Sequence, residues 1–190
     1  DFAAVKEHVA DVIAKIEPHD SFARFEALGV TVVREMAHFT GPRAVASATY
    51  QVRAKYIVIA SGSQPMLPTI PGLEQTDFYS NENIFADREK PDHLLIIGGG
   101  PIGVEMAQAH ARLGCEVTLV EALRIMGRDD RAFVDILKQN LIKAGVTLIE
   151  GVGVTSLSQI IEAGRRTITA SLDNGKQLTA SHLLMAVGRK

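Results

Sequence analysis

Three closely spaced glycines, Gly98, Gly100 and Gly103, follow an apolar run in the stretch IIGGGPIGVE. At this spacing the first glycine permits a tight turn, the second lets the backbone approach a pyrophosphate, and the third lets a helix pack closely against a strand. The unpaired N–H groups at the start of that helix would attract the negative charge of the phosphates. Chance matches to such a pattern are common, so the neighbouring elements decide between a nucleotide-binding turn and a turn that binds nothing.

An acidic residue stands where a nucleotide-binding turn requires one. Glu121 ends the next predicted strand, and 121 − 103 = 18 residues separate it from Gly103, close to the expected spacing of about 20. Its carboxylate can accept hydrogen bonds from both hydroxyls of an adenosine ribose and would repel a 2′-phosphate, which favours NAD over NADP. Arg124 leaves the NADP alternative open, because a guanidinium can pair with that phosphate. The expected NAD contacts of this region are Gly98, Gly99, Gly100, Pro101, Ile102, Gly103 and Glu121.

The elements around this turn alternate between strand and helix. The hydrophobic periodicity predicts strand, helix, strand, helix and strand over residues 93–97, 101–113, 115–121, 129–144 and 146–150. This order is typical of a parallel sheet with right-handed crossovers. On the second helix we expect one buried face, made of Phe133, Ile136, Leu137, Leu141 and Ile142.

The pattern changes after the third of these strands. The sequence Asp173-Asn174-Gly175 predicts the turn of a hairpin, so we expect an antiparallel meander before a last apolar strand at 183–187. The predicted fold class is therefore α/β, a Rossmann-like domain with a parallel sheet plus an antiparallel meander.

The N-terminal region has a different pattern. It predicts two helices and then two strands, over residues 2–16, 21–28, 30–39 and 48–60. Pro18 ends the first helix, and Ser21 is suited to cap the second. The stretch 61–72 is rich in Pro, Gly and Ser, which predicts a linker and a domain boundary.

The composition argues against several classes of protein. Apolar residues make up 46% of the chain and the net charge is −2, which gives no basic field for nucleic acid or anionic lipid. No apolar run approaches the roughly 20 residues that span a bilayer. Cys115 is the single cysteine and the six histidines are scattered, so we expect no disulfide, no metal site and a cytoplasmic setting. The chain starts at Asp1 without a methionine or signal peptide, so we expect a piece of a longer protein.

Three blocks of the sequence resemble one known family. They are YIVIASGSQPMLPTIPG at 56–72, LLIIGGGPIGVEMAQAHARLGCEVTLVE at 94–121 and LLMAVGRK at 183–190. Together they resemble the pyridine nucleotide–disulfide oxidoreductases, FAD-dependent flavoproteins that include dihydrolipoamide dehydrogenase and mercuric reductase. The first block looks like the family's return strand beside FAD, the second like its NAD-binding unit, and the third like the start of its Ala-x-Gly-Arg-x-Pro-Asn block.

The resemblance implies two dinucleotide-binding domains of the same fold. Residues 1–70 would be the second part of an FAD-binding domain, residues 71–187 the NAD(P)-binding domain, and residues 188–190 the return toward the FAD domain. The whole protein would be a homodimeric oxidoreductase that passes a hydride between NAD(H) and FAD, in the manner of dihydrolipoamide dehydrogenase. Its partner would be a small-molecule or protein-bound disulfide or another electron acceptor. With no redox cysteine pair in these 190 residues, we expect the chain alone to be inactive.

The resemblance also assigns roles to single residues, none of them catalytic. The expected contacts on the FAD side are Ala37, Ser61 and Gly62. The further expected contacts on the NAD side are Glu105, Val154 and Gly188. Glu105 matches a helix glutamate near the flavin and nicotinamide, Val154 a strand residue at the adenine, and Gly188 a glycine beside the nicotinamide.

Two alternatives to a dihydrolipoamide dehydrogenase-like enzyme remain open. An NADH oxidase or a ferredoxin or rubredoxin reductase is built on the same two domains. A member of a different class, a non-catalytic module that senses NAD, would bind NADH without reducing a flavin. Two cysteines four residues apart in the parent protein would favour disulfide chemistry.

Overall fold

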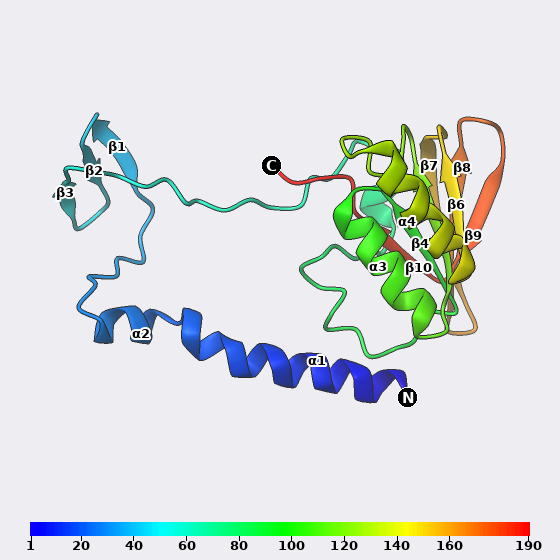
Figure 1. The fold of residues 1–190 in the computed structure, drawn as a ribbon, viewed down its shortest axis with the longest axis horizontal. Coiled ribbons are helices and arrows are strands. Elements are labelled where there is room, and N and C mark those ends of the chain that lie inside the picture. The colour runs from blue at the N-terminus through cyan, green and yellow to red at the C-terminus, as the bar shows by residue number, and fades with distance from the viewer. The chain divides into compact units, whose positions relative to one another are not determined.

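The computed structural model describes residues 1–190, which divide into two compact units (Figure 1). The larger unit joins Asp1–His8 to Ser63–Lys190, and the smaller unit is Val9–Gly62. No helix combines the length and the apolar character needed to cross a membrane.

A four-stranded parallel sheet forms the centre of the larger unit. Its strands are β4 (His93–Ile97), β5 (Glu116–Glu121), β6 (Val146–Glu150) and β10 (His182–Met185), in the order β10-β4-β5-β6. Helix α3 (Pro101–Arg112) connects β4 to β5, and helix α4 (Arg131–Lys143) connects β5 to β6. The predicted alternation of strand and helix is confirmed, with small differences at the ends of the elements.

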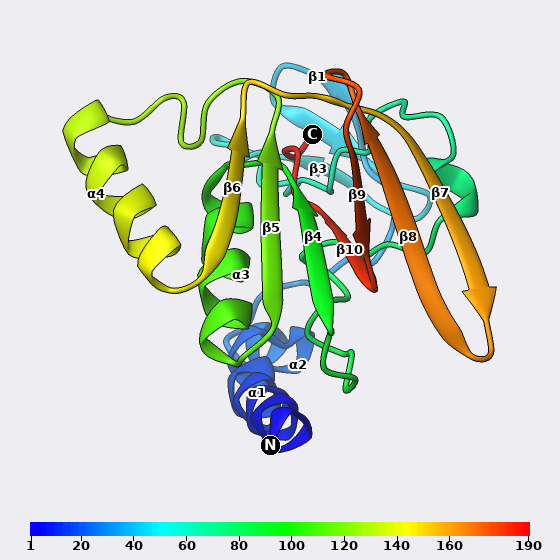
Figure 2. The same ribbon diagram turned by 90° about the vertical axis from the view of Figure 1, so that its right-hand side faces the viewer.

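A three-stranded antiparallel sheet lies beside the parallel one (Figure 2). It consists of β7 (Val154–Glu162), β8 (Arg165–Leu172) and β9 (Gln177–Ala180). Gly175, in the turn after β8, has a φ of 80° and donates its N–H to the Leu172 carbonyl, so the predicted hairpin turn is confirmed. The predicted last strand is also confirmed, as β10, and it pairs in parallel with β4.

Strand β4 shows how the larger unit is layered. Leu94 and Ile96 face one side of the sheet, where they belong to the core that includes Val104 of α3 and Leu141 of α4. Leu95 and Ile97 belong to the core on the opposite side, where they pack with apolar side chains of the antiparallel sheet. A strand that is buried on both faces reads as a continuous apolar run, as HLLII does.

The buried face of α4 differs from the expected one. Val134 and Leu141 are buried, with Leu137 packed beside them, whereas Phe133, Ile136 and Ile142 are 73%, 57% and 59% exposed. The prediction was therefore wrong for these three residues. Because the helix carries apolar residues on more than one face, the spacing alone did not identify the face that meets the sheet.

The strands of the smaller unit are much shorter than the two predicted ones. Two helices confirm the prediction: α1 (Phe2–Ile16), which begins in the larger unit, and α2 (Phe22–Ala27). The 3₁₀ turn η1 (Glu17–Asp20) follows α1, and a second 3₁₀ turn, η2 (Leu73–Gln75), lies in the larger unit. Ser21 caps α2 by accepting a hydrogen bond from the Arg24 N–H. The strands are short: β1 (His38–Gly41), β2 (Ala44–Ala46) and β3 (Gln51–Arg53).

The apolar segments outside these short strands are not strands, which corrects the predictions for 30–37 and 54–60. Tyr56, Val58 and Ile59 are 79%, 86% and 74% exposed. A strand needs a neighbour for its backbone hydrogen bonds, and no other strand of this chain pairs with these segments. A high content of β-branched residues therefore did not suffice.

Two distant segments of the larger unit pair with each other. Gln64 and Lys190 exchange backbone hydrogen bonds of 2.8 and 3.0 Å, and the Met66 N–H donates to the Gly188 carbonyl at 3.0 Å. The segments that lead into and out of the Ser63–Lys190 region therefore run antiparallel, side by side.

Candidate functional site

A large cavity of the larger unit lies at the carboxyl ends of the parallel strands. It has a volume of about 1090 Å³ and is lined by the segments that follow β4, β5 and β10. The connections from β4 lead to β5 on one side, whereas β10 lies on the other side of β4. Such a reversal of strand order opens a crevice, which is the usual place for a ligand in an open α/β sheet.

The glycine-rich turn forms one wall of this cavity. Gly98 has a φ of 112°, and its N–H donates to the Val120 carbonyl at 2.8 Å. A Cβ on Gly103 would lie 1.9 Å from the Gly98 carbonyl oxygen, so α3 and β4 approach as closely as backbones can. A Cβ on Gly100 would meet no atom within 4 Å, because this residue faces the open cavity at the start of α3.

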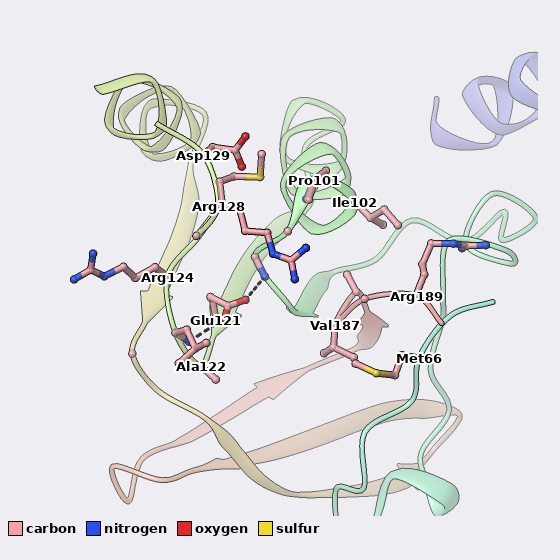
Figure 3. Close-up of a pocket in the computed structure, with 18 of the residues that line it drawn as sticks. Met66, Pro101, Ile102, Glu121, Ala122, Arg124, Arg128, Asp129, Val187 and Arg189 are labelled. Atoms are coloured by element: carbon pink, nitrogen blue, oxygen red, sulfur yellow. Dashed lines mark hydrogen bonds between the residues drawn. The ribbon is translucent and has the colours of Figure 1, made fainter. Parts of the chain in front are cut away.

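Glu121 holds the turn from the end of β5. One carboxylate oxygen accepts the Gly99 N–H at 2.7 Å, and the other accepts the Leu123 N–H at 2.9 Å (Figure 3). Gly99 is held at its other end as well, since its carbonyl accepts the Met126 N–H at 2.9 Å. The carboxylate therefore lies beside the first turn of α3, and it lines the cavity.

Two arginines near Glu121 point in different directions (Figure 3). The Arg128 guanidinium reaches into the cavity toward the glycine turn, whereas the Arg124 side chain extends away from it. Sequence reasoning named Arg124 as the cation that would accept a 2′-phosphate and missed Arg128. The run GRDDR did not indicate Arg128 as a site residue, because its charges also suit the start of a helix.

The opposite end of the cavity is lined mainly by apolar residues, and Arg189 beside them donates hydrogen bonds to Ser63 and Asn81. Ala186, Val187 and Gly188 follow β10 and line this end, together with Met66 from the paired segment. The Met66 thioether lies next to Val187 in Figure 3. Met66 was not among the expected contacts, since it stands in the Pro-rich linker, where only tertiary pairing brings it to the site.

The remaining expected site residues lie outside this cavity. Glu105 is exposed on α3, and Val154 packs against the core between the two sheets. Ala37, Ser61 and Gly62 belong to the smaller unit, and all three are exposed. Among residues 1–190, no group of three or more His, Cys, Asp and Glu side chains is placed to hold a metal ion.

The cavity wall fits a dinucleotide phosphate. Gly100 leaves space for a group that a side chain would fill, and α3 starts without a side-chain cap. The first N–H groups of a helix have no partner inside it, so those of Ile102 and Gly103 are available to an anion. Glu121 supplies an acceptor for hydroxyls at the same wall.

The chain belongs to the pyridine nucleotide-disulphide oxidoreductase family, which matches residues 3–190. The resemblance found in the sequence is thereby confirmed, together with the α/β fold of FAD- and NAD-dependent disulfide reductases. Members of this family are oxidoreductases.

Several known proteins are similar to this chain. A mercuric reductase of Streptomyces lividans is 35% identical over 142 residues, which are 75% of this chain and 30% of that protein. A dihydrolipoyl dehydrogenase of Thermus scotoductus is 32% identical over 85% of this chain and 35% of its own. The Cu(II) complex of the HOCl-induced flavoprotein disulfide reductase RclA from Escherichia coli superposes with a TM-score of 0.84 at 28% identity, over 100% of this chain and 43% of that one. The chain thus spans about a third of the length of these curated relatives.

Proposed function

We propose that this chain is the NAD(H)-binding portion of an FAD-dependent oxidoreductase that passes a hydride between NAD(H) and flavin. The observation that carries the proposal is the cavity at the strand-order reversal, with the glycine turn, the start of α3 and Glu121 on one wall. Residues 71–187 would form the NAD-binding domain, and residues 1–70 and 188–190 would contribute to an FAD-binding domain.

The cavity suggests a direction for the bound nucleotide. The pyrophosphate would lie over Gly100 and the first turn of α3, and the adenosine ribose would meet Glu121. The nicotinamide would then reach the apolar end at Val187 and Gly188, beside Met66. When bound, NADH supplies the hydride that a flavin accepts, and the apolar end would keep water away from that ring.

Glu121 favours NAD over NADP, because a 2′-phosphate would lie against its carboxylate. Its two hydrogen bonds to Gly99 and Leu123 keep the carboxylate in place before a ligand arrives. Arg128 supports the second candidate, NADP, since its guanidinium faces the same part of the cavity. It equally suits the pyrophosphate of either nucleotide.

The parent enzyme would reduce or oxidise a disulfide or another electron acceptor, and it would act as a cytoplasmic homodimer. The similarity to a dihydrolipoyl dehydrogenase and to mercuric reductases supports disulfide-type chemistry for that parent. An NADH oxidase or ferredoxin reductase is the alternative enzyme. A non-catalytic NAD-sensing module is the alternative of a different class, and it predicts NADH binding without flavin reduction.

Titration with NADH and with NADPH, followed by nicotinamide fluorescence, tests the site. We expect tighter binding of NADH. Gly100→Glu should weaken NADH binding by at least tenfold, because it places a carboxylate where the pyrophosphate would lie. Ala109→Glu, on the exposed side of the same helix, is the matched control and should bind like the wild type.

Each other outcome has a defined meaning. Equal loss of binding in both variants, or unchanged binding in Gly100→Glu, would contradict the phosphate position. Tighter binding of NADPH would favour the second candidate and assign the 2′-phosphate to Arg128.

A further inference from the structure

The segment between β5 and α4, residues 122–130, brings several charged side chains to the cavity. We call it the lip. It carries both Arg124 and Arg128, and most of its residues line the cavity. The lip is irregular, without a helix or strand over most of its length, so contacts with neighbouring elements must fix its course.

Two backbone N–H groups at the middle of the lip donate hydrogen bonds to neighbouring elements. The Ile125 side chain is fully buried in the core below the helices. The Ile125 N–H donates to a carboxylate oxygen of Glu150 at 2.8 Å, and the Met126 N–H donates to Gly99 at 2.9 Å. Met126 has a φ of 47°, a left-handed conformation that costs a side-chain-bearing residue about 1 kcal/mol or more. Neighbouring contacts must therefore maintain this turn.

Glu150 connects the lip to α4. Its second carboxylate oxygen forms an ion pair with Lys138, and both side chains are about three-quarters buried, at 25% and 28% exposure. Burial alone would raise the pKa of Glu150, but the hydrogen bonds from Lys138 and from the Ile125 N–H together hold the pKa below its ordinary value. Glu150 is thus charged at neutral pH, with each oxygen engaged.

Glu150 lies directly beside Glu121 in the sheet. The two residues are register partners at the ends of β5 and β6. Glu121 lines the cavity, whereas Glu150 does not, so any effect of Glu150 on a ligand passes through the lip. Two adjacent carboxylates therefore have separate tasks: one faces the ligand and holds the glycine turn, and the other holds the lip.

We propose that Glu150, held by Lys138, is a positioning residue that fixes the lip with Arg128 facing the cavity and Arg124 facing away, and so sets the discrimination between NADH and NADPH. The proposal rests on the proposed function. Once the lip is released, the Arg124 guanidinium can join that of Arg128 near Glu121 and the ribose, which favours a 2′-phosphate and disturbs the position of Glu121 that suits NADH.

The test compares Glu150→Ala with Glu150→Gln in the 190-residue chain. The glutamine keeps an acceptor for the Ile125 N–H, whereas the alanine removes it. We expect amide hydrogen exchange at Ile125 and Met126 to become at least tenfold faster in Glu150→Ala and to stay near the wild type in Glu150→Gln. The ratio of NADH to NADPH affinity should fall about tenfold in Glu150→Ala, and Glu150→Gln should recover most of it.

Two further variants give the controls. Lys138→Met removes the ion pair but leaves the acceptor, so its effect should be intermediate. Glu74→Ala removes an exposed glutamate away from the cavity and should change neither measurement. A general loss of folding in Glu150→Ala would reduce both affinities equally and accelerate exchange throughout the larger unit, and that result would overturn the proposal.

The failure of this proposal differs from the failure of the proposed function. If the wild type binds NADH and Glu150→Ala keeps the same affinities and the same preference, Glu150 is not a positioning residue. If the wild type binds neither nucleotide, the proposed function is wrong and this proposal falls with it.

Discussion

Gly103 shows how a single residue type is imposed by its surroundings. Its missing Cβ would lie 1.9 Å from the Gly98 carbonyl oxygen, which is part of the turn at the cavity. The requirement comes from backbone atoms on both sides, so no side-chain rearrangement can relieve it. The sequence predicted this close approach, because a glycine at that spacing serves helix–strand packing.

Substitution at Gly103 should therefore destabilise the fold. For Gly103→Ala we expect a loss of about 1–3 kcal/mol or more in the free energy of unfolding, as in other overpacked cores. Urea unfolding followed by circular dichroism measures it. Gly100→Ala is the matched control, since its Cβ would enter open space at a φ of −77°. Equal stability of the two variants would contradict the close approach of α3 to the Gly98 carbonyl.

The contacts of Glu121 show what residue types alone did not reveal. Its spacing predicted a carboxylate at the end of β5. Its hydrogen bonds to Gly99 and Leu123 depend on the course of the chain after the strand, which no local pattern specifies. The same holds for Arg128, whose direction is set by the lip and not by its neighbours in the sequence.

At the scale of elements, the sequence predicted the order and type of the helices and strands better than it predicted which of their faces are buried. The strands β4, β5 and β6 and the helices between them follow from periodicity, because each meets the core along a regular set of positions. Helix α4 was predicted at the correct place in the chain, but its apolar residues lie on more than one face, so the buried face was not identified. The segments at 30–37 and 54–60 have strand-like composition and no pairing partner, so tertiary context overrode propensity.

The corrected face of α4 makes a prediction. Leu141→Ala should cost about 2–5 kcal/mol, because the side chain is fully buried against the sheet. Phe133→Ala should cost less than about 1 kcal/mol, although it removes a larger side chain, because Phe133 is 73% exposed. Urea unfolding of the two variants measures the difference, and a loss in Phe133→Ala as large as that in Leu141→Ala would support the face expected from the sequence.

At the scale of the whole molecule, the larger unit encloses a cluster of ionisable side chains that the sequence scatters. Lys6, at the start of α1, donates to the Ile84 carbonyl at 2.8 Å and is buried. His110 of α3 and His182 of β10 are buried nearby, and the His182 Nε2 lies 3.6 Å from Asp87 without a hydrogen bond. The charged groups around the two rings are Lys6, Asp87, Glu89, Asp92 and Arg166.

This cluster makes stability depend on pH. Burial lowers the pKa of His110 and of His182, although Asp87 opposes the shift. The unfolded chain therefore binds protons that the folded chain does not. Stability should be highest above the ordinary histidine pKa of about 6.5 and should fall as the pH decreases below it. Urea unfolding at pH 7.5 and 5.5 measures this loss.

The histidines can be tested for their share of that loss. Replacing both by glutamine, as His110→Gln with His182→Gln, should flatten the dependence between these two pH values. His8→Gln, at an exposed position, should leave it unchanged. An equally steep dependence in the double variant would assign the effect to other groups.

The pairing of Gln64 with Lys190 has a topological consequence. Because these residues exchange two backbone hydrogen bonds, the chain between them begins and ends at one place. A segment whose two ends lie side by side can be inserted into another fold, or circularly permuted, without a change in the distance between the points where it is joined. All the residues that line the cavity at the carboxyl ends of the strands belong to this segment, so the cavity would be carried with it into a new host.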